Sequence, residues 1–253
     1  RLRAGESMGR QIAVVSGKGG VGKTTVAGGI AGTLAAMGRC VLLIDGDVGL
    51  GNLDLMLGIE GEAVHDLLEV LGGHCPLRSA LLRISKEHPL WYLPLALSMR
   101  ADFSNLPRLP EVLATLRDKF DDVIVDCPAG LGETVRCLTQ GADLALVVTT
   151  PDLAAVRDAR RTMQMLAQMN REARLVINRI RPSLIQQGDA PDVDDIIDSV
   201  GAQLLGLIPE DALVTPLQNA GVPVIFQTAS PAAAQIRDVA RRLQGEHRPL
   251  RFP

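Results

Sequence analysis

The chain has 253 residues, of which 47% are hydrophobic and only 2% are aromatic. This length suits one large α/β domain with a core of Val, Leu, Ile and Ala, and it leaves little room for a second domain. The formal net charge of -3 provides no global attraction to nucleic acid or acidic lipid, and no apolar run approaches the roughly 20 residues that span a bilayer. Residues 1–7 lack the apolar segment of a signal peptide, so we interpret them as an extension ahead of a single domain over residues 8–253.

Short apolar runs rich in Val, Ile and Leu alternate with helical patterns, which is typical of parallel βαβ units whose sheet is covered on both faces. Strands are predicted over residues 12–16, 41–45, 91–95, 123–126, 144–148, 175–177, 204–208 and 224–226. We therefore predict an α/β fold with a doubly wound, mostly parallel sheet of about eight strands, which binds its ligands at the carboxyl ends of those strands. Residues 181–195 are predicted to form one long loop, whose aspartates we interpret as surface or helix-capping groups.

A glycine-rich segment joins the first predicted strand to a helix predicted from Thr24, and residues 17–25 read GKGGVGKTT. Such a turn directs backbone N–H groups and a helix N-terminus at an anion. Lys23 would reach the outer phosphates of a nucleotide, and the Thr24 hydroxyl would bind Mg²⁺. The additional lysine, Lys18, is either a solvated side chain or a charge supplied across a subunit interface in the manner of an arginine finger.

The glycines alone do not identify the ligand. Gly17, Gly19 and Gly22 also satisfy the G-x-G-x-x-G pattern of dinucleotide-binding proteins, and Asp45 follows where that pattern places a ribose-binding acid. Lys23 and the threonine after it favour a nucleoside triphosphate, because a terminal phosphate with magnesium needs a cation and a hydroxyl, whereas a dinucleotide is held mainly by backbone N–H groups.

Two further predicted strands end in carboxylates. Asp126 ends one of them, an arrangement that holds magnesium in P-loop enzymes. No glutamate follows it, so the group that positions the attacking water must come from elsewhere. Residues 45–52 are the candidate, because Asp45 and Asp47 lie among glycines beside the loop. We expect one of them to face the magnesium and the other to face the water.

The cysteines and histidines predict no metal centre. The four cysteines lie far apart without a C-x-x-C pair, and the four histidines are equally scattered. We interpret the cysteines as reduced thiols and the histidines as ordinary surface or core groups.

Residues 18–25 are identified as the deviant Walker A loop of the ParA/MinD family of ATPases. Residues 45–50, 52–54, 126–130, 178–182, 206–211 and 248–252 resemble the MinD branch of that family, so the resemblance extends from about Met8 to the end of the sequence. It implies a protein that binds ATP and Mg²⁺, hydrolyses ATP, and forms a homodimer when ATP is bound.

The resemblance also implies roles for individual residues. Lys18 would cross to the partner's phosphates, Asp47 would help to orient the attacking water, and residues around Asn178 would receive the adenine. The predicted catalytic residues are Lys18, Lys23 and Asp47. The predicted magnesium ligands are Thr24, Asp45 and Asp126. The predicted nucleotide-binding residues are Gly17, Lys18, Gly19, Gly20, Val21, Gly22, Lys23, Thr24, Thr25, Asn178, Arg179, Pro209 and Asp211.

The function that the resemblance implies is placement of the division septum. MinD-like members bind the inner face of the cell membrane as ATP-bound dimers, recruit MinC, and are released when MinE stimulates hydrolysis. We therefore expect MinC-like and MinE-like regulators and a cytoplasmic protein that cycles to the membrane as a peripheral protein. Members attach through a C-terminal amphipathic helix, whereas residues 248–253 are too short to form one, so we expect this chain to bind lipid weakly.

Three other functions are kept as alternatives. A DNA-segregation ATPase of the ParA type needs clustered Lys or Arg, whereas lysines are scarce here and the residues after Asp47 depart from the Asp-Pro-Gln run typical of ParA. No specific nucleic acid is therefore expected as a partner. A flagellar-number regulator of the FlhG type would share the membrane cycle. An iron–sulfur carrier requires paired cysteines, which Cys127 and Cys137 do not convincingly provide.

Overall fold

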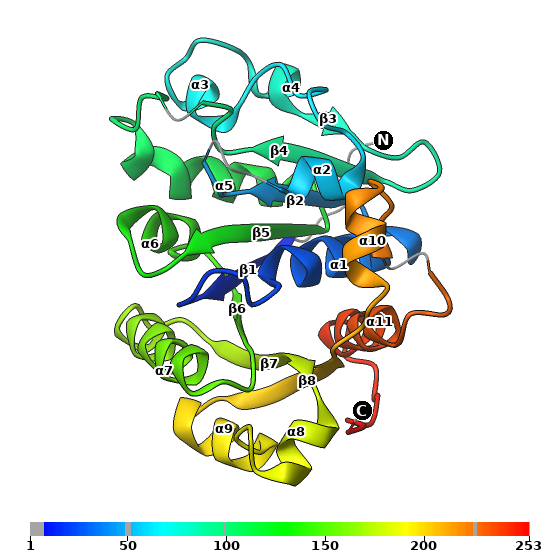
Figure 1. Cartoon of the computed structure of the whole chain (residues 1–253). Coiled ribbons are helices and arrows are strands. Elements are labelled where there is room, and N and C mark those ends of the chain that lie inside the picture. Colours follow the sequence, from blue (N-terminus) through cyan, green and yellow to red (C-terminus); the bar gives the residue numbers. More distant parts are fainter. Residues whose placement is uncertain (1–7, 49–51, 99, 225–226, 253) are drawn as a thin grey trace.

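The computed structural model describes residues 8–48, 52–98, 100–224 and 227–252, and its centre is a twisted sheet with helices on both faces (Figure 1). The strands are β1 (Arg10–Ser16), β2 (Val41–Asp45), β3 (Leu82–Arg83), β4 (Leu90–Pro94), β5 (Asp122–Ala129), β6 (Leu144–Thr149), β7 (Ala173–Ile180) and β8 (Gln203–Pro209). Their order across the sheet is β3-β4-β2-β5-β1-β6-β7-β8, and every neighbouring pair is parallel except β3 and β4. The predicted fold class is confirmed.

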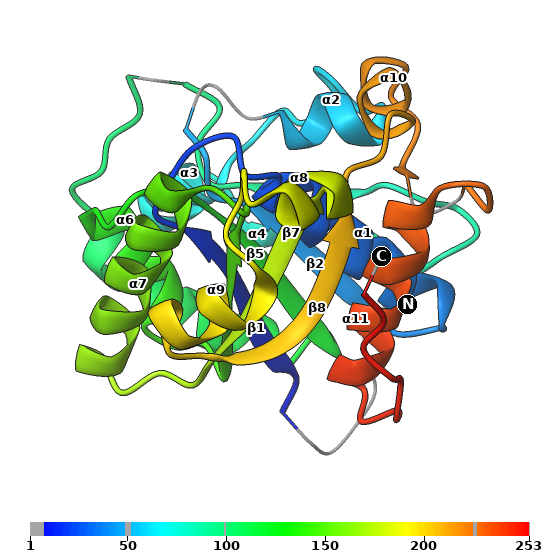
Figure 2. The same cartoon turned by 60° about the horizontal axis from the view of Figure 1, so that its bottom comes forward.

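Helices cover both faces of this sheet. They are α1 (Lys23–Ala36), α2 (Leu53–Leu57), α3 (Leu67–Leu71), α4 (Leu77–Ala80), α5 (Leu109–Arg117), α6 (Glu133–Thr139), α7 (Leu153–Gln168), α8 (Pro182–Gln187), α9 (Val193–Val200), α10 (Val214–Asn219) and α11 (Pro231–Leu243), with a 3-10 turn η1 (Leu106–Arg108). Helices α1, α2 and α11 contribute to the core on one face, whereas α3, α5, α6, α7 and α9 contribute to the core on the other. After α11 the chain turns back along that helix, and Arg242 donates hydrogen bonds to the carbonyls of Arg248 and Pro249 (Figure 2).

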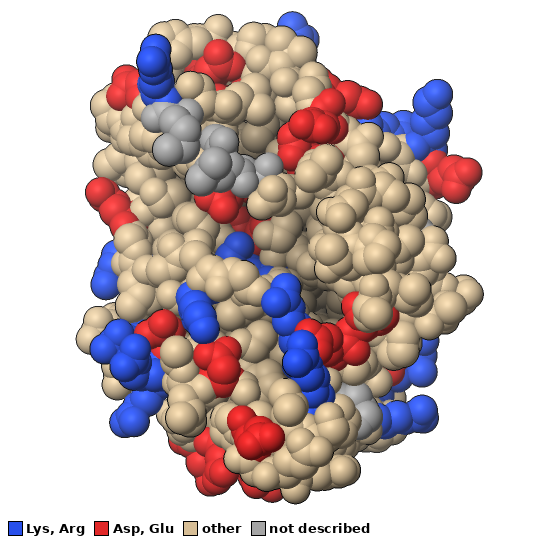
Figure 3. All heavy atoms as spheres, in the orientation of Figure 1, with Lys and Arg blue, Asp and Glu red and all other residues tan. Residues whose placement is uncertain are grey.

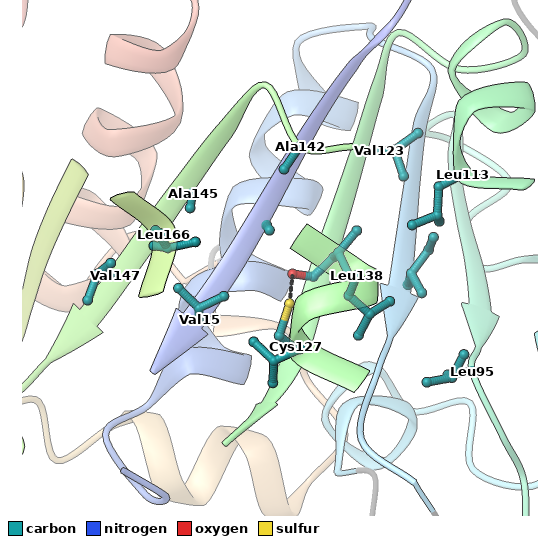
Figure 4. Packing of buried hydrophobic residues seen from close by; sticks show 14 of the residues in the cluster. Val15, Leu95, Leu113, Val123, Cys127, Leu138, Ala142, Ala145, Val147 and Leu166 are labelled. Atoms are coloured by element: carbon teal, nitrogen blue, oxygen red, sulfur yellow. Dashed lines mark hydrogen bonds between the residues drawn. The ribbon is translucent and has the colours of Figure 1, made fainter. Parts of the chain in front are cut away.

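The central strand β1 has four consecutive apolar residues at positions 12–15, because both of its faces are covered. Ile12 and Val14 belong to the core on the side of α1, and Ala13 and Val15 belong to the core on the side of α6 and α7. All four are fully buried, because a strand covered on both faces has no polar side. Figure 4 shows the second of these cores, in which strand residues such as Val15 pack close to helical leucines.

Seven of the predicted strands correspond to β1, β2 and β4 to β8, with ends that differ by at most three residues. The eighth prediction, residues 224–226, is wrong at Val224, which lies in a 3-10 turn, and residues 225–226 lie outside the described part of the chain. The eighth strand is instead β3 at the sheet edge. Sequence periodicity cannot detect it, because two residues are too few to show an alternation.

The loop predicted over residues 181–195 is also wrong, because α8 and the start of α9 occupy it. Pro182 is the first residue of α8, a position whose N–H group would have no partner within the helix, so proline costs no hydrogen bond there. Gly188 ends the helix with a φ of 76°. Asp192 accepts a hydrogen bond of 2.7 Å from the backbone N of Asp195 and so caps α9. The capping role that we expected for the acids of this segment is therefore found at Asp192.

Candidate functional site

The glycine-rich loop connects the carboxyl end of β1 to the first turn of α1, at the middle of the sheet. Gly20 and Gly22 have φ values of 80° and 89°, a left-handed conformation that side chains rarely adopt. A Cβ atom on Gly22 would also lie 2.2 Å from Nδ2 of Asn178. Because the first N–H groups of α1 have no partner within the helix, they are available to an anion held by the loop.

A cavity of about 340 Å³ opens beside this loop. Its lining includes Gly19, Gly20, Gly22, Lys23, Thr24 and Thr25 from the loop and the start of α1. Asp47 lines the cavity as well. Figure 3 shows the surface hollowed beside the bulge that α10 forms in this view. Six of the nine loop residues predicted to bind the nucleotide thus line one cavity, whereas Gly17, Lys18 and Val21 do not line it.

Lys23 is paired with a carboxylate at the floor of the site. Its Nζ lies 2.8 Å from Oδ1 of Asp126, and the two residues are only 8% and 1% exposed. The Thr24 hydroxyl also forms a hydrogen bond with Asp126. Burial raises the pKa of Asp126 although the charge of Lys23 opposes this. The lysine and the carboxylate of the motif therefore hold each other in place.

Asp45 is a second buried carboxylate, 2% exposed, at the end of β2. Its Oδ1 accepts a hydrogen bond of 3.0 Å from the backbone N of Asp47, and its Oδ2 accepts one of 3.4 Å from the hydroxyl of Tyr92. Burial, followed by the charge of Asp126, raises the pKa of Asp45 to about 7. The floor of the site thus holds more negative charge than Lys23 can balance.

These residues fit a magnesium ion. Thr24, Asp45 and Asp126 offer the oxygen donors that Mg²⁺ prefers, and the excess negative charge favours a cation. In the described part of the chain, the oxygens of Asp45, Asp47 and Asp126 do not gather within 4.8 Å of one another. A closed cage of protein atoms is not required for Mg²⁺, which usually keeps several waters and shares its ligands with substrate phosphates.

Lys18 does not line this cavity. Its Nζ lies 3.1 Å from Oδ1 of Asp152, and both side chains are 45% exposed. Asp152 caps α7 by accepting a hydrogen bond from the backbone N of Ala155, and it accepts another from the Thr150 hydroxyl. Within one chain, Lys18 therefore contacts the start of α7 instead of the phosphate cavity.

A smaller cavity of about 170 Å³ adjoins the first and shares Gly22 and Thr25 with it. The four residues predicted to receive the adenine all line it: Asn178, Arg179, Pro209 and Asp211. The Nδ2 atom of Asn178 donates a hydrogen bond of 2.8 Å to the carbonyl of Val21 in the glycine-rich loop. Arg179 has a φ of 56°, which is uncommon for a residue with a side chain and occurs preferentially at functional sites.

Asp211 differs from the other residues of this cavity because its carboxylate is already engaged. It accepts hydrogen bonds from the Ser230 hydroxyl at 2.6 Å, from the backbone N of Leu213 at 2.9 Å and from that of Ala232 at 3.2 Å. Although burial opposes the effect, these hydrogen bonds lower the pKa of Asp211. These hydrogen bonds therefore hold the Asp211 carboxylate in place as part of the cavity wall.

Two contributors were not predicted from the sequence. Gln218 of α10 lines both cavities, and its Nε2 donates a hydrogen bond of 2.6 Å to the Thr25 hydroxyl. Tyr92, the single tyrosine of the chain, contacts Asp45 from β4. Neither residue belongs to a motif, and only the pairing of distant segments brings them to the site. Residues 49–51, which are part of the predicted acidic run, lie outside the described residues.

Comparison with known proteins gives consistent matches over nearly the whole chain. The family model described as "ParA: NUBPL iron-transfer P-loop NTPase" matches residues 7–244. The septum site-determining protein MinD of Bacillus subtilis (strain 168) is 39% identical over 246 residues, which cover 96% of this chain and 92% of that protein.

Two solved structures are similar in fold and in sequence. The MinC:MinD cell division protein complex of Aquifex aeolicus matches with a TM-score of 0.87 and 37% identity, over 96% of this chain and 99% of that one. The septum site-determining protein MinD of Pyrococcus horikoshii, complexed with Mg-ADP, matches with a TM-score of 0.83 and 30% identity, over 93% and 96% of the two chains.

Proposed function

The chain belongs to the MinD branch of the ParA family of P-loop ATPases, and on that premise we propose that it hydrolyses ATP to determine where the division septum forms. Its substrate is ATP and its cofactor is Mg²⁺. The observation that carries the proposal is a glycine-rich loop whose Lys23 pairs with the buried carboxylate of Asp126, in a chain closely similar to septum site-determining proteins.

In the proposed mechanism the phosphates bind in the larger cavity. Lys23 and the N–H groups at the start of α1 neutralise the phosphate charge, which is the main way in which P-loop enzymes accelerate transfer. Thr24, Asp45 and Asp126 would hold Mg²⁺, which supplies further charge neutralisation when bound. Asp47 lines the cavity and would orient the attacking water. Asn178, Arg179, Pro209 and the Asp211 wall would receive the adenine.

In this proposal Lys18 acts in the ATP-bound dimer rather than in its own cavity. Its only polar side-chain contact among the described hydrogen bonds and ion pairs is the exposed pair with Asp152. Exposed pairs contribute about 0–1 kcal/mol, so the lysine can leave Asp152 at little loss. We propose that it then contacts the phosphates of a second copy of the chain when ATP is bound.

Regulators and the membrane complete the proposed cycle. Because a relative is solved as a MinC:MinD complex, we infer a MinC-like partner for this chain, and a MinE-like activator is expected with it. No described helix has the length and apolar character of a membrane span. We propose a cytoplasmic protein that attaches reversibly to the inner face of the cell membrane as a peripheral protein, as its similarity to MinD proteins suggests.

The alternative functions have less support. In Figure 3, lysines and arginines lie interspersed with acids over the face that is shown, which does not resemble the clustered cations of a DNA-binding surface. Cys127 is fully buried in the core, so its thiol is not exposed to bind an iron–sulfur cluster together with Cys137. A flagellar role would use the same ATP cycle, and the cell experiment below distinguishes it.

Replacing Asp47 with alanine should leave ATP binding nearly intact and lower turnover at least 100-fold. Asp47 lines the cavity, whereas the hydrogen-bond partner of Lys23 is Asp126, so we expect removal of the Asp47 carboxylate to affect the attacking water rather than phosphate binding. Binding is measured with a fluorescent ATP analogue, turnover by phosphate release, and dimerisation by light scattering with ATP, where the variant should accumulate as dimer. Turnover at the parent rate would remove Asp47 from the mechanism.

Replacing Lys18 with alanine should leave the monomer folded and abolish ATP-dependent dimerisation and hydrolysis. The matched control is Lys86→Ala, which removes an exposed lysine outside the site. In host cells that lack the gene, the wild type and the control should restore septum position, whereas Lys18→Ala should not. Normal septa with altered flagellar number in the deletion strain would contradict the septum function, and normal dimerisation of Lys18→Ala would contradict the role in the partner site.

A further inference from the structure

A second group of potential metal ligands lies outside the ATP cavities, at the start of α3 and in the connection from α3 to α4 (Figure 1). His65, Glu69 and Cys75 each offer one ligand atom, and the three atoms lie within 4.8 Å of one another. We propose that these three side chains form a zinc-binding site. The inference is independent of the proposed ATPase cycle, because none of the three residues lines either cavity.

The backbone places the first two ligands on one side of the helix start. His65 immediately precedes Asp66, the N-cap of α3, and Glu69 is the third residue of the helix. Glu69 Oε2 accepts a hydrogen bond from the backbone N of Asp66 at 3.2 Å, and the Asp66 side chain accepts one from the backbone N of Glu69 at 2.8 Å. This capping box brings Glu69 Oε2 to within 2.9 Å of His65 Nδ1.

A tight turn after α3 brings the third ligand to the same place. Gly73 has a φ of 76°, and the backbone N of His74 donates a hydrogen bond of 2.9 Å to the carbonyl of Glu69. Cys75 follows directly and packs half-buried against the core. Since these contacts are made by the backbone, the three ligands are brought together without the help of a metal. Because the ligands are preorganised, zinc binding would require little further ordering of their side chains.

The donor set identifies the metal. Imidazole, thiolate and carboxylate are the ligands of Zn²⁺ in proteins, whereas Mg²⁺ and Ca²⁺ prefer oxygen atoms alone. Tetrahedral zinc would use the three side chains and one water, and solvent reaches the group because the side chains of His65 and Glu69 are 38% and 41% exposed. Binding would replace the hydrogen bond between His65 and Glu69 with two metal bonds, so the proton on His65 Nδ1 would move to Nε2 by way of solvent, and the Cys75 thiol proton would be released to solvent.

The site would stabilise the segment in which it lies. Leu68 of α3 donates a backbone hydrogen bond of 3.0 Å to Leu95, and Asp66 Oδ2 accepts one of 2.9 Å from the backbone N of Leu97, so α3 is attached to the chain that leaves β4. The sequence predicts no metal centre among its scattered cysteines and histidines. The proximity of His65 and Cys75 is not evident in the sequence, because their spacing of ten residues matches no zinc motif.

The test uses the full-length, metal-stripped protein with a non-thiol reductant and excess Mg²⁺, which competes for the carboxylates of the ATP site. Co²⁺ serves as the probe because it gives a charge-transfer band in the near ultraviolet when a thiolate binds it. We expect a band that saturates at about one equivalent of Co²⁺ and disappears when Zn²⁺ is added. Zn²⁺ should also raise the Tm of the wild type.

Cys75→Ser should abolish the band, and His65→Gln should weaken Zn²⁺ binding at least 10-fold in calorimetry. The matched controls are Cys137→Ser and His247→Gln, which should bind both metals like the wild type. ATP hydrolysis by each variant verifies that it is folded. A wild type without the band, an unchanged band in Cys75→Ser, or loss of the band in Cys137→Ser would each overturn the proposal.

Discussion

Replacing Lys23 with alanine should abolish ATP binding and also destabilise the nucleotide-free protein. The loss of binding follows from removal of the cation at the floor of the cavity, and we expect affinity for a fluorescent ATP analogue to fall at least 100-fold. The loss of stability has a separate cause, because Lys23 Nζ lies 2.8 Å from Asp126 and both groups are buried. Removing one partner of such a pair typically costs about 3–5 kcal/mol, since it leaves a buried charge without compensation.

The pH dependence of the Lys23→Ala variant tests this explanation. Burial already raises the pKa of Asp126, and loss of the lysine removes a charge that lowers it. A carboxyl whose pKa is higher in the folded state binds an extra proton there, so its stability is greatest at low pH and falls as the pH rises through the folded pKa. Urea unfolding at pH 5 and pH 8 should therefore show the larger deficit at pH 8.

The double variant Lys23→Ala, Asp126→Asn separates the two effects. It removes the unpaired charge, so it should regain much of the stability while still failing to bind ATP. If the single and double variants unfold alike at pH 8, the buried pair is not the cause of the deficit. If Lys23→Ala binds ATP like the wild type, the assignment of the loop lysine is wrong.

Asp45→Asn should stabilise the nucleotide-free, magnesium-free protein at pH 8. Asp45 has a raised pKa of about 7 in the folded protein, against a reference value of 3.8. Each pKa unit corresponds to about 1.36 kcal/mol, so ionisation of Asp45 in the folded protein lowers the free energy of unfolding by an amount on the order of 4 kcal/mol. The wild type is therefore most stable below pH 4 with respect to this group and loses stability as the pH rises through 7. Asparagine has the same shape and does not ionise.

The advantage of Asp45→Asn should thus grow between pH 5 and about pH 7 and level off by pH 8, when unfolding in urea is measured in the presence of EDTA. Asp118→Asn, a change at an exposed carboxylate outside the site, is the control and should unfold like the wild type. Adding Mg²⁺ and ATP should reverse the order, because the metal compensates the charge only in the wild type. A difference between variant and wild type that stays constant over this pH range would exclude ionisation of Asp45 as its cause.

The parts that the sequence predicts well are those in which local pattern and structure coincide. Residues of β1 and β2 are buried on both faces, so they form uninterrupted apolar runs, and Lys23 and Thr24 are adjacent in the sequence because one turn of backbone holds the phosphates. The same reasoning recovers Asp126, since a carboxylate at the end of an apolar strand is itself a local pattern.

The parts that the sequence does not predict depend on contacts between distant segments. Gln218 is 193 residues from Thr25, with which it shares a hydrogen bond, and nothing in the sequence around α10 indicates the site. Tyr92 reaches Asp45 only because β4 pairs with β2. Cys75 approaches His65 only because the chain reverses after α3. In each case the tertiary fold, rather than local residue preference, creates the contact.

The contact between Asn178 and the glycine-rich loop links the two cavities of the proposed nucleotide site. One hydrogen bond joins the wall of the smaller cavity to the carbonyl of Val21, and Gly22 has no space for a side chain between them. This contact ties the wall of the smaller cavity to the loop that lines the larger one. We therefore expect the protein to select ligands by the distance between base and terminal phosphate, so that a ligand with a shorter or longer connection between these ends would bind less tightly.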